Sequence, residues 1–344
     1  MRLRYILLFS FAIAYALTPM IRLIARRMKI YDYPNRRKIH KRPVALLGGV
    51  SVYLAFMIPL CFNLAAPSPL QGIMIAGTII FIAGLMDDVK KLPASTRLVT
   101  QVLAAVILII YDVKVSFLPV SFLGNIGESV LTVVWIVGIT NAMNCLDGVD
   151  GLAASLGIII AGCFFAIAYS TDQPWFGYIA IALVGGLLGF LKYNLSPAKI
   201  FLGDAGSTFI GFMLACVAML GTYAENGKVS LFIPLLVLGI PIYDMCMTTI
   251  LRVRKGVVKN VVDWLKYAGK DHFHHRLIDL GFGPRGIIAL MGGLSLWLGL
   301  SAIVLRDSDI QDALLLLIQA AIVFTVITIL IMVGARERRR KRSR

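Results

Sequence analysis

Long apolar stretches separated by short polar breaks run along almost the whole chain. Each is close to the ~20 residues that an α-helix needs to cross the hydrocarbon core of a bilayer. The eleven stretches are 5–25, 44–63, 70–86, 96–111, 127–146, 152–169, 175–191, 206–223, 230–251, 287–305 and 312–334. This pattern predicts an all-α polytopic membrane protein with about eleven transmembrane helices in one bundle.

The composition supports this fold class. Hydrophobic residues make up 59% of the 344 residues and charged residues 15%, and the mean hydropathy is +0.84. A water-soluble globule has about 25% charged residues, so that class is excluded. The first stretch is too long for a signal peptide and no small-residue cleavage site follows it, so we expect a retained span.

Lysine and arginine are distributed unevenly between alternate loops. They are frequent after the first, third, seventh and ninth stretches and in the C-terminal tail, whereas the opposite loops carry only Lys114, Lys228 and Arg306. Because basic loops stay in the cytoplasm, we expect the N-terminus outside and the C-terminus inside. Arg2 and Arg4, at the predicted outer end, run against this rule.

Two basic segments border the predicted membrane surface. The tail 336–344 reads RERRRKRSR and favours contact with anionic membrane lipid over nucleic acid, for which we expect no binding. In the loop after the ninth stretch, apolar residues recur at helical spacing over 258–268. That spacing predicts a short amphipathic helix in the interface, either covering a site or lying as a plain surface helix.

Carboxylates and amides gather at the predicted cytoplasmic ends of three stretches. A charged side chain at membrane depth costs ~2.5–3.5 kcal/mol, so its default interpretation is functional. The residues concerned are Asp87 and Asp88 at the end of the third stretch, Asn141, Asn144, Asp147 and Asp150 at the end of the fifth, and Asp204 at the start of the eighth. We expect these three helices to converge on one site.

Each group also has a structural explanation. Asp204, followed by Ser207, could simply cap the eighth helix. Asp87 and Asp88 could be interfacial residues neutralised by the basic residues that follow them. The four polar residues at the end of the fifth stretch are harder to explain by packing, because the first three step along one flank of a helix.

The chemistry of this group points to a metal and a phosphate. Gly148 and Gly151 indicate that the fifth helix gives way to a loop, where a ligand can approach the backbone closely. Carboxylate and amide oxygens without thiolates are hard ligands, which suit Mg²⁺ and also Mn²⁺. The cluster therefore predicts metal-assisted phosphate chemistry.

Histidines and cysteines add further constraints. All four histidines lie in predicted cytoplasmic loops: His40 in RRKIHKRP, and His272, His274 and His275 in DHFHHR. The basic neighbours of the triplet favour an anion over zinc, and Arg276 has the planar fork that suits a phosphate. The five cysteines are odd in number and show no CxxC, so neither a disulfide framework nor a zinc site is indicated.

With these motifs in chain order, the sequence resembles the polyprenyl-phosphate N-acetylhexosamine-1-phosphate transferases. Five motifs carry the likeness: RKIHKRPVALLGG at 37–49, DDVKKLPASTR at 87–97, NAMNCLDGVDGLA at 141–153, FLGDAGS at 201–207 and HFHHR at 272–276. The resemblance implies transfer of a sugar 1-phosphate to undecaprenyl phosphate with release of UMP, and we expect the donor to be UDP-GlcNAc, which supplies GlcNAc-1-phosphate. It implies one transmembrane catalytic domain over 1–335 in the plasma (inner) membrane, with the active site on the cytoplasmic face.

The resemblance also implies roles for individual residues. Asp87, Asp88 and Asp204 would be catalytic, and Asp204 with Asn144 would hold Mg²⁺. The nucleotide and sugar would be placed by Asn141, Asp147, Asp150, His272, His274, His275 and Arg276. Arg97 and His40 would contact the lipid phosphate or pyrophosphate. One departure matters: the first acidic motif is often DDxxD in the family, but its last position here is Lys91, so no third carboxylate role is assigned there.

Several alternatives remain open. Within the family, the peptidoglycan branch uses UDP-MurNAc-pentapeptide, but its histidine run is followed by an acid, where this chain has Arg276. A secondary transporter would also place acids in the membrane, although it would place them near the midplane and in matching broken helices. Direct attack by the lipid phosphate is favoured over a covalent aspartyl-phosphate. The oligomeric state is open, with a homodimer among the options.

Overall fold

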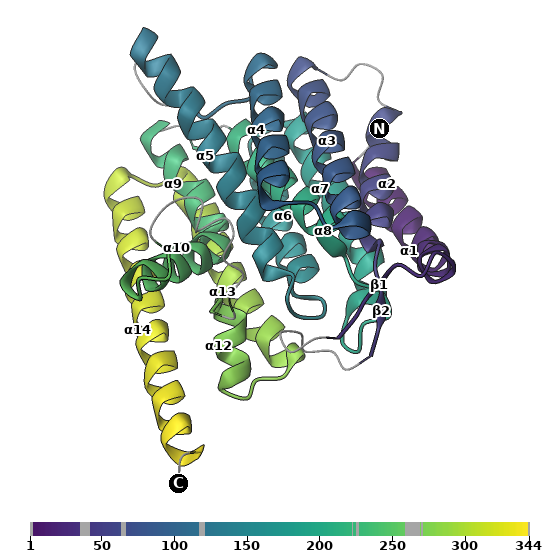
Figure 1. The fold of residues 1–344 in the computed structure, drawn as a ribbon. Coiled ribbons are helices and arrows are strands. Elements are labelled where there is room, and N and C mark those ends of the chain that lie inside the picture. Colours follow the sequence, from purple (N-terminus) through teal and green to yellow (C-terminus); the bar gives the residue numbers. More distant parts are fainter. Residues whose placement is uncertain are drawn as a thin grey trace. The chain divides into compact units, whose positions relative to one another are not determined.

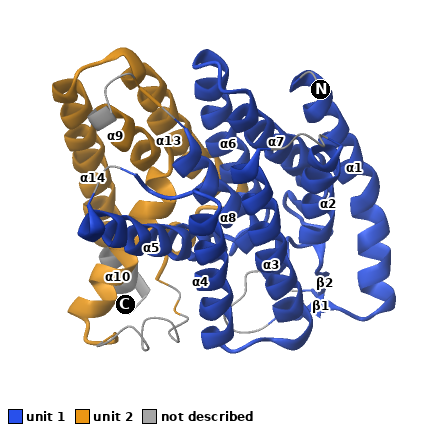
Figure 2. Ribbon diagram, turned by 90° about the horizontal axis from the view of Figure 1, so that it is seen from above, with its two compact units in different colours: residues 1–222 blue, residues 223–344 orange. Residues whose placement is uncertain are grey.

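The computed structural model describes residues 3–34, 42–62, 67–116, 121–221, 223–224, 227–258, 269 and 271–342, with only the backbone of 227, 228 and 335–342. The chain divides into two compact units, Met1–Thr222 and Tyr223–Arg344, here called unit 1 and unit 2 (Figure 2). Each is described by itself. The expected amphipathic helix over 258–268 lies outside the described residues, apart from Val258.

Unit 1 is a bundle of helices built around one central member (Figure 1). Its helices are α1 (Leu3–Arg27), α2 (Gly48–Cys61), α3 (Ser68–Lys90), α4 (Ala94–Ile110), α5 (Phe122–Leu146), α6 (Leu152–Ser170), α7 (Pro174–Asn194) and α8 (Gly203–Leu220). The central helix is α8, which is buried at almost every position from Gly203 to Ala218 and packs against α2, α3, α5 and α6. A helix that is apolar all round belongs in the core of such a bundle.

Unit 2 is also helical. It contains α9 (Gly227–Val237), α10 (Gly239–Arg254), α12 (Phe273–Asp279), α13 (Pro284–Val304), the 3₁₀ turn η1 (Leu305–Asp307) and α14 (Ile310–Arg342). The apolar stretch 230–251 is therefore not one straight span: Val229–Val237 and Gly239–Arg254 meet at a bend of 76°. Pro234 lies inside α9, where it removes one helical hydrogen bond.

Each of the eleven predicted stretches contains a helix, but not all are long enough to count as spans. Eight helices in the described residues have the length and hydropathy to cross a membrane, or nine if the bent pair α9 and α10 is one span. The other two, α2 and α4, are apolar but shorter, with 14 and 17 residues. The structure therefore supports an all-helical protein with eight or nine candidate spans, and the count of eleven stays a prediction. The single catalytic domain expected over 1–335 also stays a prediction.

The second stretch begins later than predicted, because its first residues form a strand. Val44–Ala45 (β2) pairs in antiparallel register with Tyr31–Asp32 (β1), and Ala45 also bridges Ile200 in parallel. The predicted boundary at 44 was wrong by four residues, because the apolar character of this segment serves strand pairing. Phe201 then accepts the backbone N–H of Gly48 at 2.9 Å, so the start of α2 is attached to the loop before α8.

Glycines allow two helices to approach the start of α8 very closely. A Cβ on Gly84 of α3 would lie 2.6 Å from Cα of Ala205, and one on Gly49 of α2 would meet the backbone of Gly206. Gly203 itself has φ +76°, a conformation that L-residues rarely adopt. These contacts fix the first turn of α8 against α2 and α3, and this turn carries Asp204.

Candidate active site

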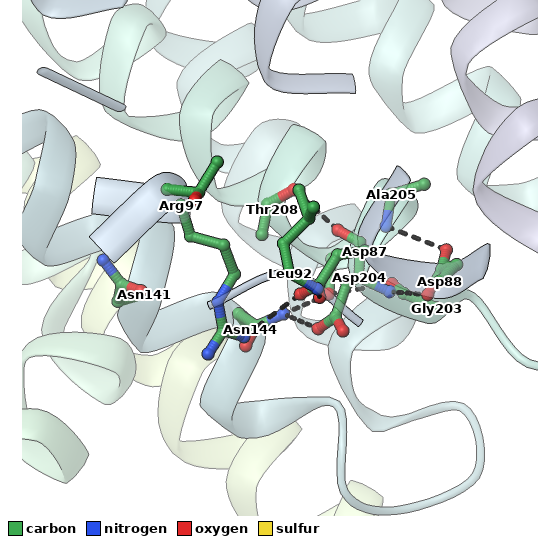
Figure 3. A network of polar contacts seen from close by, with 12 residues as sticks. Asp87, Asp88, Leu92, Arg97, Asn141, Asn144, Gly203, Asp204, Ala205 and Thr208 are labelled. Carbon is green, nitrogen blue, oxygen red and sulfur yellow. Dashed lines mark hydrogen bonds and ion pairs between the residues drawn. The ribbon is translucent and has the colours of Figure 1, made fainter. Parts of the chain in front are cut away.

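The acids of α3 and α8 come together as predicted (Figure 3). Asp88 of α3 accepts two backbone N–H bonds from the first turn of α8, from Asp204 at 2.7 Å and from Ala205 at 3.1 Å. The first N–H groups of a helix have no partner within the helix, and the partial positive charge there favours a carboxylate. Asp88 therefore caps α8 from a neighbouring helix.

The side chain of Asp204 has a different partner. Its Oδ1 accepts a hydrogen bond from Nδ2 of Asn144 on α5 at 2.6 Å, and the same amide nitrogen donates to Oγ of Ser207 at 2.9 Å. The capping explanation for Asp204 therefore does not fit, because Asp88 performs that role. The prediction that the third, fifth and eighth stretches converge is confirmed by these contacts.

Asp87 lies beside Asp204 and is held at both carboxylate oxygens. Oδ1 accepts the backbone N–H of Leu92 at 2.5 Å, and Oδ2 accepts from Nη1 of Arg97 at 3.2 Å. The carboxyl group of Asp87 also lies within hydrogen-bonding reach of the Asp204 carboxyl group. Arg97 therefore neutralises Asp87, as one of the predicted explanations required. The carboxyl groups of Asp87 and Asp204 nevertheless remain in contact with each other.

Asn141 does not face the acids but forms an amide pair with Gln101 of α4. Its Nδ2 donates to Oε1 of Gln101 at 2.7 Å and to the carbonyl of Val137 at 2.8 Å. Figure 3 shows Asn141 to one side of the carboxylate group. Although Asn141 and Asn144 are three residues apart, they serve two different neighbouring helices. Gln101, which is 3% exposed, was missed, since a single glutamine near the start of an apolar stretch carries no signal of its own.

Asp147 follows the end of α5 and lies in a strongly acidic environment. Burial raises the pKa of Asp147 well above its ordinary value, and the negative charges of Asp204 and Asp88 raise it further. Asp150 and Asp32 contribute in the same direction. Asp32, in β1, was also missed by sequence reasoning, although it belongs to the acidic surroundings of this site. A cation bound here would relieve the repulsion.

The turn after α5 is tied to the loop that leads into α8. Oδ2 of Asp150 accepts the backbone N–H of Ala198 at 3.0 Å. The buried side chain of Asn194 accepts from the N–H of Gly151 at 3.1 Å and donates to the carbonyl of Ile200 at 3.0 Å. Gly151 has φ +76°, which confirms that the glycines mark the end of helix α5 and a turn. These bonds position the acidic loop relative to α8.

The histidine segment belongs to unit 2. His272 is bonded to Asp244 and Arg252 of α10, while His274 is 1% exposed and both of its ring nitrogens lack a hydrogen-bond partner within the described chain. Burial lowers the pKa of His274 to about 3, and the neighbouring His275 lowers it in the same direction. His274 is therefore neutral, with two polar atoms that a ligand could satisfy.

Arg276 lies one turn further along α12. Its Nε donates to the backbone carbonyl of Asp271 at 2.9 Å, which directs the planar guanidinium back across the start of the helix. His275 has its ring 4.3 Å from that of His274, measured between ring centroids. The predicted phosphate contact of His40 concerns a residue outside the described part of the chain.

The acidic cluster offers the donors that Mg²⁺ prefers. No three Asp, Glu, His or Cys side chains within the described ranges form a ready-made metal cage. Mg²⁺ usually binds through one or two carboxylates together with substrate phosphates and water, and the adjoining carboxyl groups of Asp87 and Asp204 beside the Asn144 amide supply such oxygens. The residues present therefore fit this ion.

Helical architecture and site together define a multi-pass membrane protein with a carboxylate-rich centre on converging helices. A family model for glycosyl transferase family 4 matches residues 70–222, which include all but the first two residues of α3, the whole of α4 to α8, and the acidic cluster. The chain is 32% identical to a probable undecaprenyl-phosphate N-acetylglucosaminyl 1-phosphate transferase of Bacillus subtilis, over 88% of this chain and 84% of the relative.

Two further relatives agree. A decaprenyl-phosphate N-acetylglucosaminephosphotransferase of Mycobacterium leprae is 31% identical over 84% of this chain and 79% of its own length. An undecaprenyl-phosphate alpha-N-acetylglucosaminyl 1-phosphate transferase of Escherichia coli is 27% identical over 78% and 75%. The chain therefore belongs to the polyprenyl-phosphate N-acetylglucosamine-1-phosphate transferase family, which confirms the resemblance of its motifs.

Proposed function

We propose that this protein transfers GlcNAc-1-phosphate from UDP-GlcNAc to undecaprenyl phosphate, the first lipid-linked step of a cell-envelope polysaccharide. An oxygen of the lipid phosphate attacks the phosphorus that carries the sugar. The bond from that phosphorus to UMP breaks, UMP leaves with the bridging oxygen, and the lipid and sugar become joined by a diphosphate. The convergence of Asp87, Asp88 and Asp204 with Asn144 is the observation that carries the proposal, together with the names of the relatives.

Asp204 and Asn144 are the residues that would hold Mg²⁺, and Mn²⁺ has the same preference for hard oxygen ligands. Such an ion supplies charge neutralisation at the diphosphate of the donor. Its binding would also relieve the repulsion between the Asp87 and Asp204 carboxylates.

The acids have separate tasks in this proposal. A phosphomonoester has a second pKa of about 6, so the lipid phosphate needs orientation more than deprotonation. Asp87, with Arg97 at its Oδ2, orients the incoming phosphate, whereas Asp88 uses both oxygens to hold the first turn of α8. A covalent phospho-aspartate at Asp87 is the alternative route.

Donor contacts are proposed for two segments of the chain. In unit 1, Asp147 and Asp150 lie on the turn after α5 and would place the nucleotide. In unit 2, His274 has buried nitrogens without partners, and Arg276 presents a planar guanidinium. A guanidinium fork suits a phosphate, and a neutral imidazole can donate to or accept from a sugar or a base.

The reaction is tested with purified protein, MgCl₂, undecaprenyl phosphate and a panel of UDP-sugars. We expect UMP release that needs both the lipid and UDP-GlcNAc, a lipid product heavier by one GlcNAc-phosphate, and loss of turnover with EDTA that excess Mg²⁺ restores. UDP-MurNAc-pentapeptide should react more slowly than UDP-GlcNAc. The reverse order would assign the chain to the peptidoglycan reaction, and no UMP release with any donor would refute the proposed activity.

The site is proposed to face the cytoplasm, with the N-terminus outside and the tail 336–344 inside. The asymmetry of lysine and arginine between alternate loops supports this orientation. Single cysteines introduced into each terminal segment of a cysteine-free variant, labelled by an impermeant reagent in sealed vesicles of known orientation, test it. Labelling of the tail from the outer side would overturn both the orientation and the side of the site.

A further inference from the structure

Four charged or polar side chains of unit 2 form a continuous hydrogen-bonded chain. Asp244 and Arg252 come from α10 and are 1% and 5% exposed, whereas Asp271 and His272 precede α12. Arg252 binds Asp271 through two bonds of 2.7 Å, from Nε to Oδ2 and from Nη2 to Oδ1. Nη2 of Arg252 also lies 3.2 Å from Nε2 of His272, and Nδ1 of His272 lies 2.7 Å from Oδ2 of Asp244.

The partners of His272 determine where its ring carries a proton. A guanidinium has only donors, so Nε2 of His272 must accept from Arg252. A carboxylate has only acceptors, so Nδ1 carries the proton and donates to Asp244. His272 is thus a neutral imidazole in the Nδ1–H form, and each ring nitrogen is occupied by a residue of α10.

Asp244 links this ring to the start of α12. Its second oxygen, Oδ1, accepts the backbone N–H of Phe273 at 2.6 Å. A buried carboxylate is costly unless such partners compensate for lost solvation. The same carboxylate therefore orients His272 and holds the first residue of the short helix that presents His274 and Arg276.

The neighbouring histidine is in the opposite situation. His274 is as deeply buried as Asp244, but both of its ring nitrogens lack partners in the described structure, whereas those of His272 are engaged. The two rings are nearly parallel, with centroids 6.1 Å apart. One histidine is thus part of the support, and the other is left with open hydrogen-bonding capacity.

We propose that Asp244 is a positioning residue for the donor-binding segment, acting through His272. It holds His272 in the Nδ1–H form and fixes the beginning of α12, so that His274 and Arg276 meet the UDP-sugar in a defined orientation. His272 itself makes no ring-nitrogen contact with the donor. This inference rests on the proposed function, and it moves His272 from the substrate-contacting residues to the supporting ones.

Asp244→Asn is the informative substitution. An amide offers one oxygen in place of two, so it cannot accept from both Phe273 and His272. The NH₂ group of the new asparagine would face Nδ1 of His272 and favour the Nε2–H form of the ring. That form places the Nε2 proton against the N–H groups of Arg252, which are also donors. We expect the KM for UDP-GlcNAc to rise about 10–100-fold, by analogy with the effect of replacing residues that orient metal-ligating histidines. The KM for undecaprenyl phosphate should change by no more than about twofold, well below that range.

The tautomer supplies a readout independent of activity. The chain has only four histidines, so ¹⁵N-histidine labelling with NMR can resolve His272, assigned by its loss in His272→Gln. We expect the Nδ1–H form in the wild type and in Arg252→Lys, and its loss in Asp244→Asn. A wild-type His272 in the Nε2–H form overturns the proposal even if the Asp244 variant fails to fold. Asp307→Asn, at an exposed carboxylate of unit 2, is the matched control and should match the wild type.

A double-mutant cycle separates positioning from simple stabilisation. If Asp244 acts through His272, the effects of Asp244→Asn and His272→Gln on the donor KM will not add, and the double variant will resemble the more severe single one. Additive effects would show that Asp244 does not act through this ring. Failure of the proposed activity would appear as no UMP release by the wild type, while the NMR experiment would still decide the role of Asp244.

Discussion

Asp204→Asn is expected to lower turnover about 10²–10³-fold, the size of effect seen when a group that stabilises charge in an active site is removed. The folded protein should survive, because the first turn of α8 is capped by Asp88 and not by Asp204. The amide also keeps an oxygen that can accept from Asn144 at the position of Oδ1. Steady-state UMP release and a thermal unfolding curve in detergent measure the two effects separately.

Two further variants make this test specific. Asp172→Asn changes an exposed acid at φ +51°, a conformation that asparagine tolerates well, and should leave both activity and stability unchanged. Asp88→Ala removes two bonds to the start of α8 and should reduce stability as well as activity. Near-normal turnover of Asp204→Asn would refute the role of Asp204 in holding the metal.

His274→Phe should weaken the use of the donor without lowering the stability of the fold. A buried polar group without a partner costs about 1–3 kcal/mol, and His274 has two such atoms. Replacement by an apolar ring should therefore leave the unfolding temperature unchanged or raise it. If the ring binds the UDP-sugar, kcat/KM for the donor should fall about 10–100-fold, the value of one or two hydrogen bonds to the sugar or base.

The acid stability of the same variant gives a second measurement. The pKa of His274 is about 3 in the folded chain, below its ordinary value of 6.5. Between these values the unfolded chain binds more protons, so wild-type stability falls as the pH drops below 6.5, by up to about 1.4 kcal/mol per pH unit. His274→Phe lacks this loss, and its advantage in unfolding temperature should grow towards acidic pH.

Leu277→Met, a volume-conserving change at a buried position of α12, controls for effects on the packing of this helix and should retain activity. If His274→Phe keeps full donor kinetics, the ring is a packing residue and its role in donor binding is refuted.

Much of the fold could be predicted from local properties of the chain. Each of the eleven long apolar runs contains a helix, and prolines mark several of the helix starts, as Pro174 does for α7 and Pro284 for α13. The same local pattern misread 44–47, where apolar residues form β2 and a short connection to α2, and it did not reveal the bend between α9 and α10. An apolar run shows that a segment avoids water, but not whether it stays straight.

The candidate site divides in the same way. The sequence by itself determined that acids stand at the ends of the third, fifth and eighth stretches, because a charge beside an apolar helix is visible without any partner. Only the tertiary structure decided that Asp88 caps α8 across 117 residues of chain, that Asn141 pairs with Gln101, and that Asp244 orients His272. Those pairings depend on how each helix is rotated and packed against its neighbour. The partner of each polar group is set by that rotation and packing, and a local pattern of residues carries no information about either.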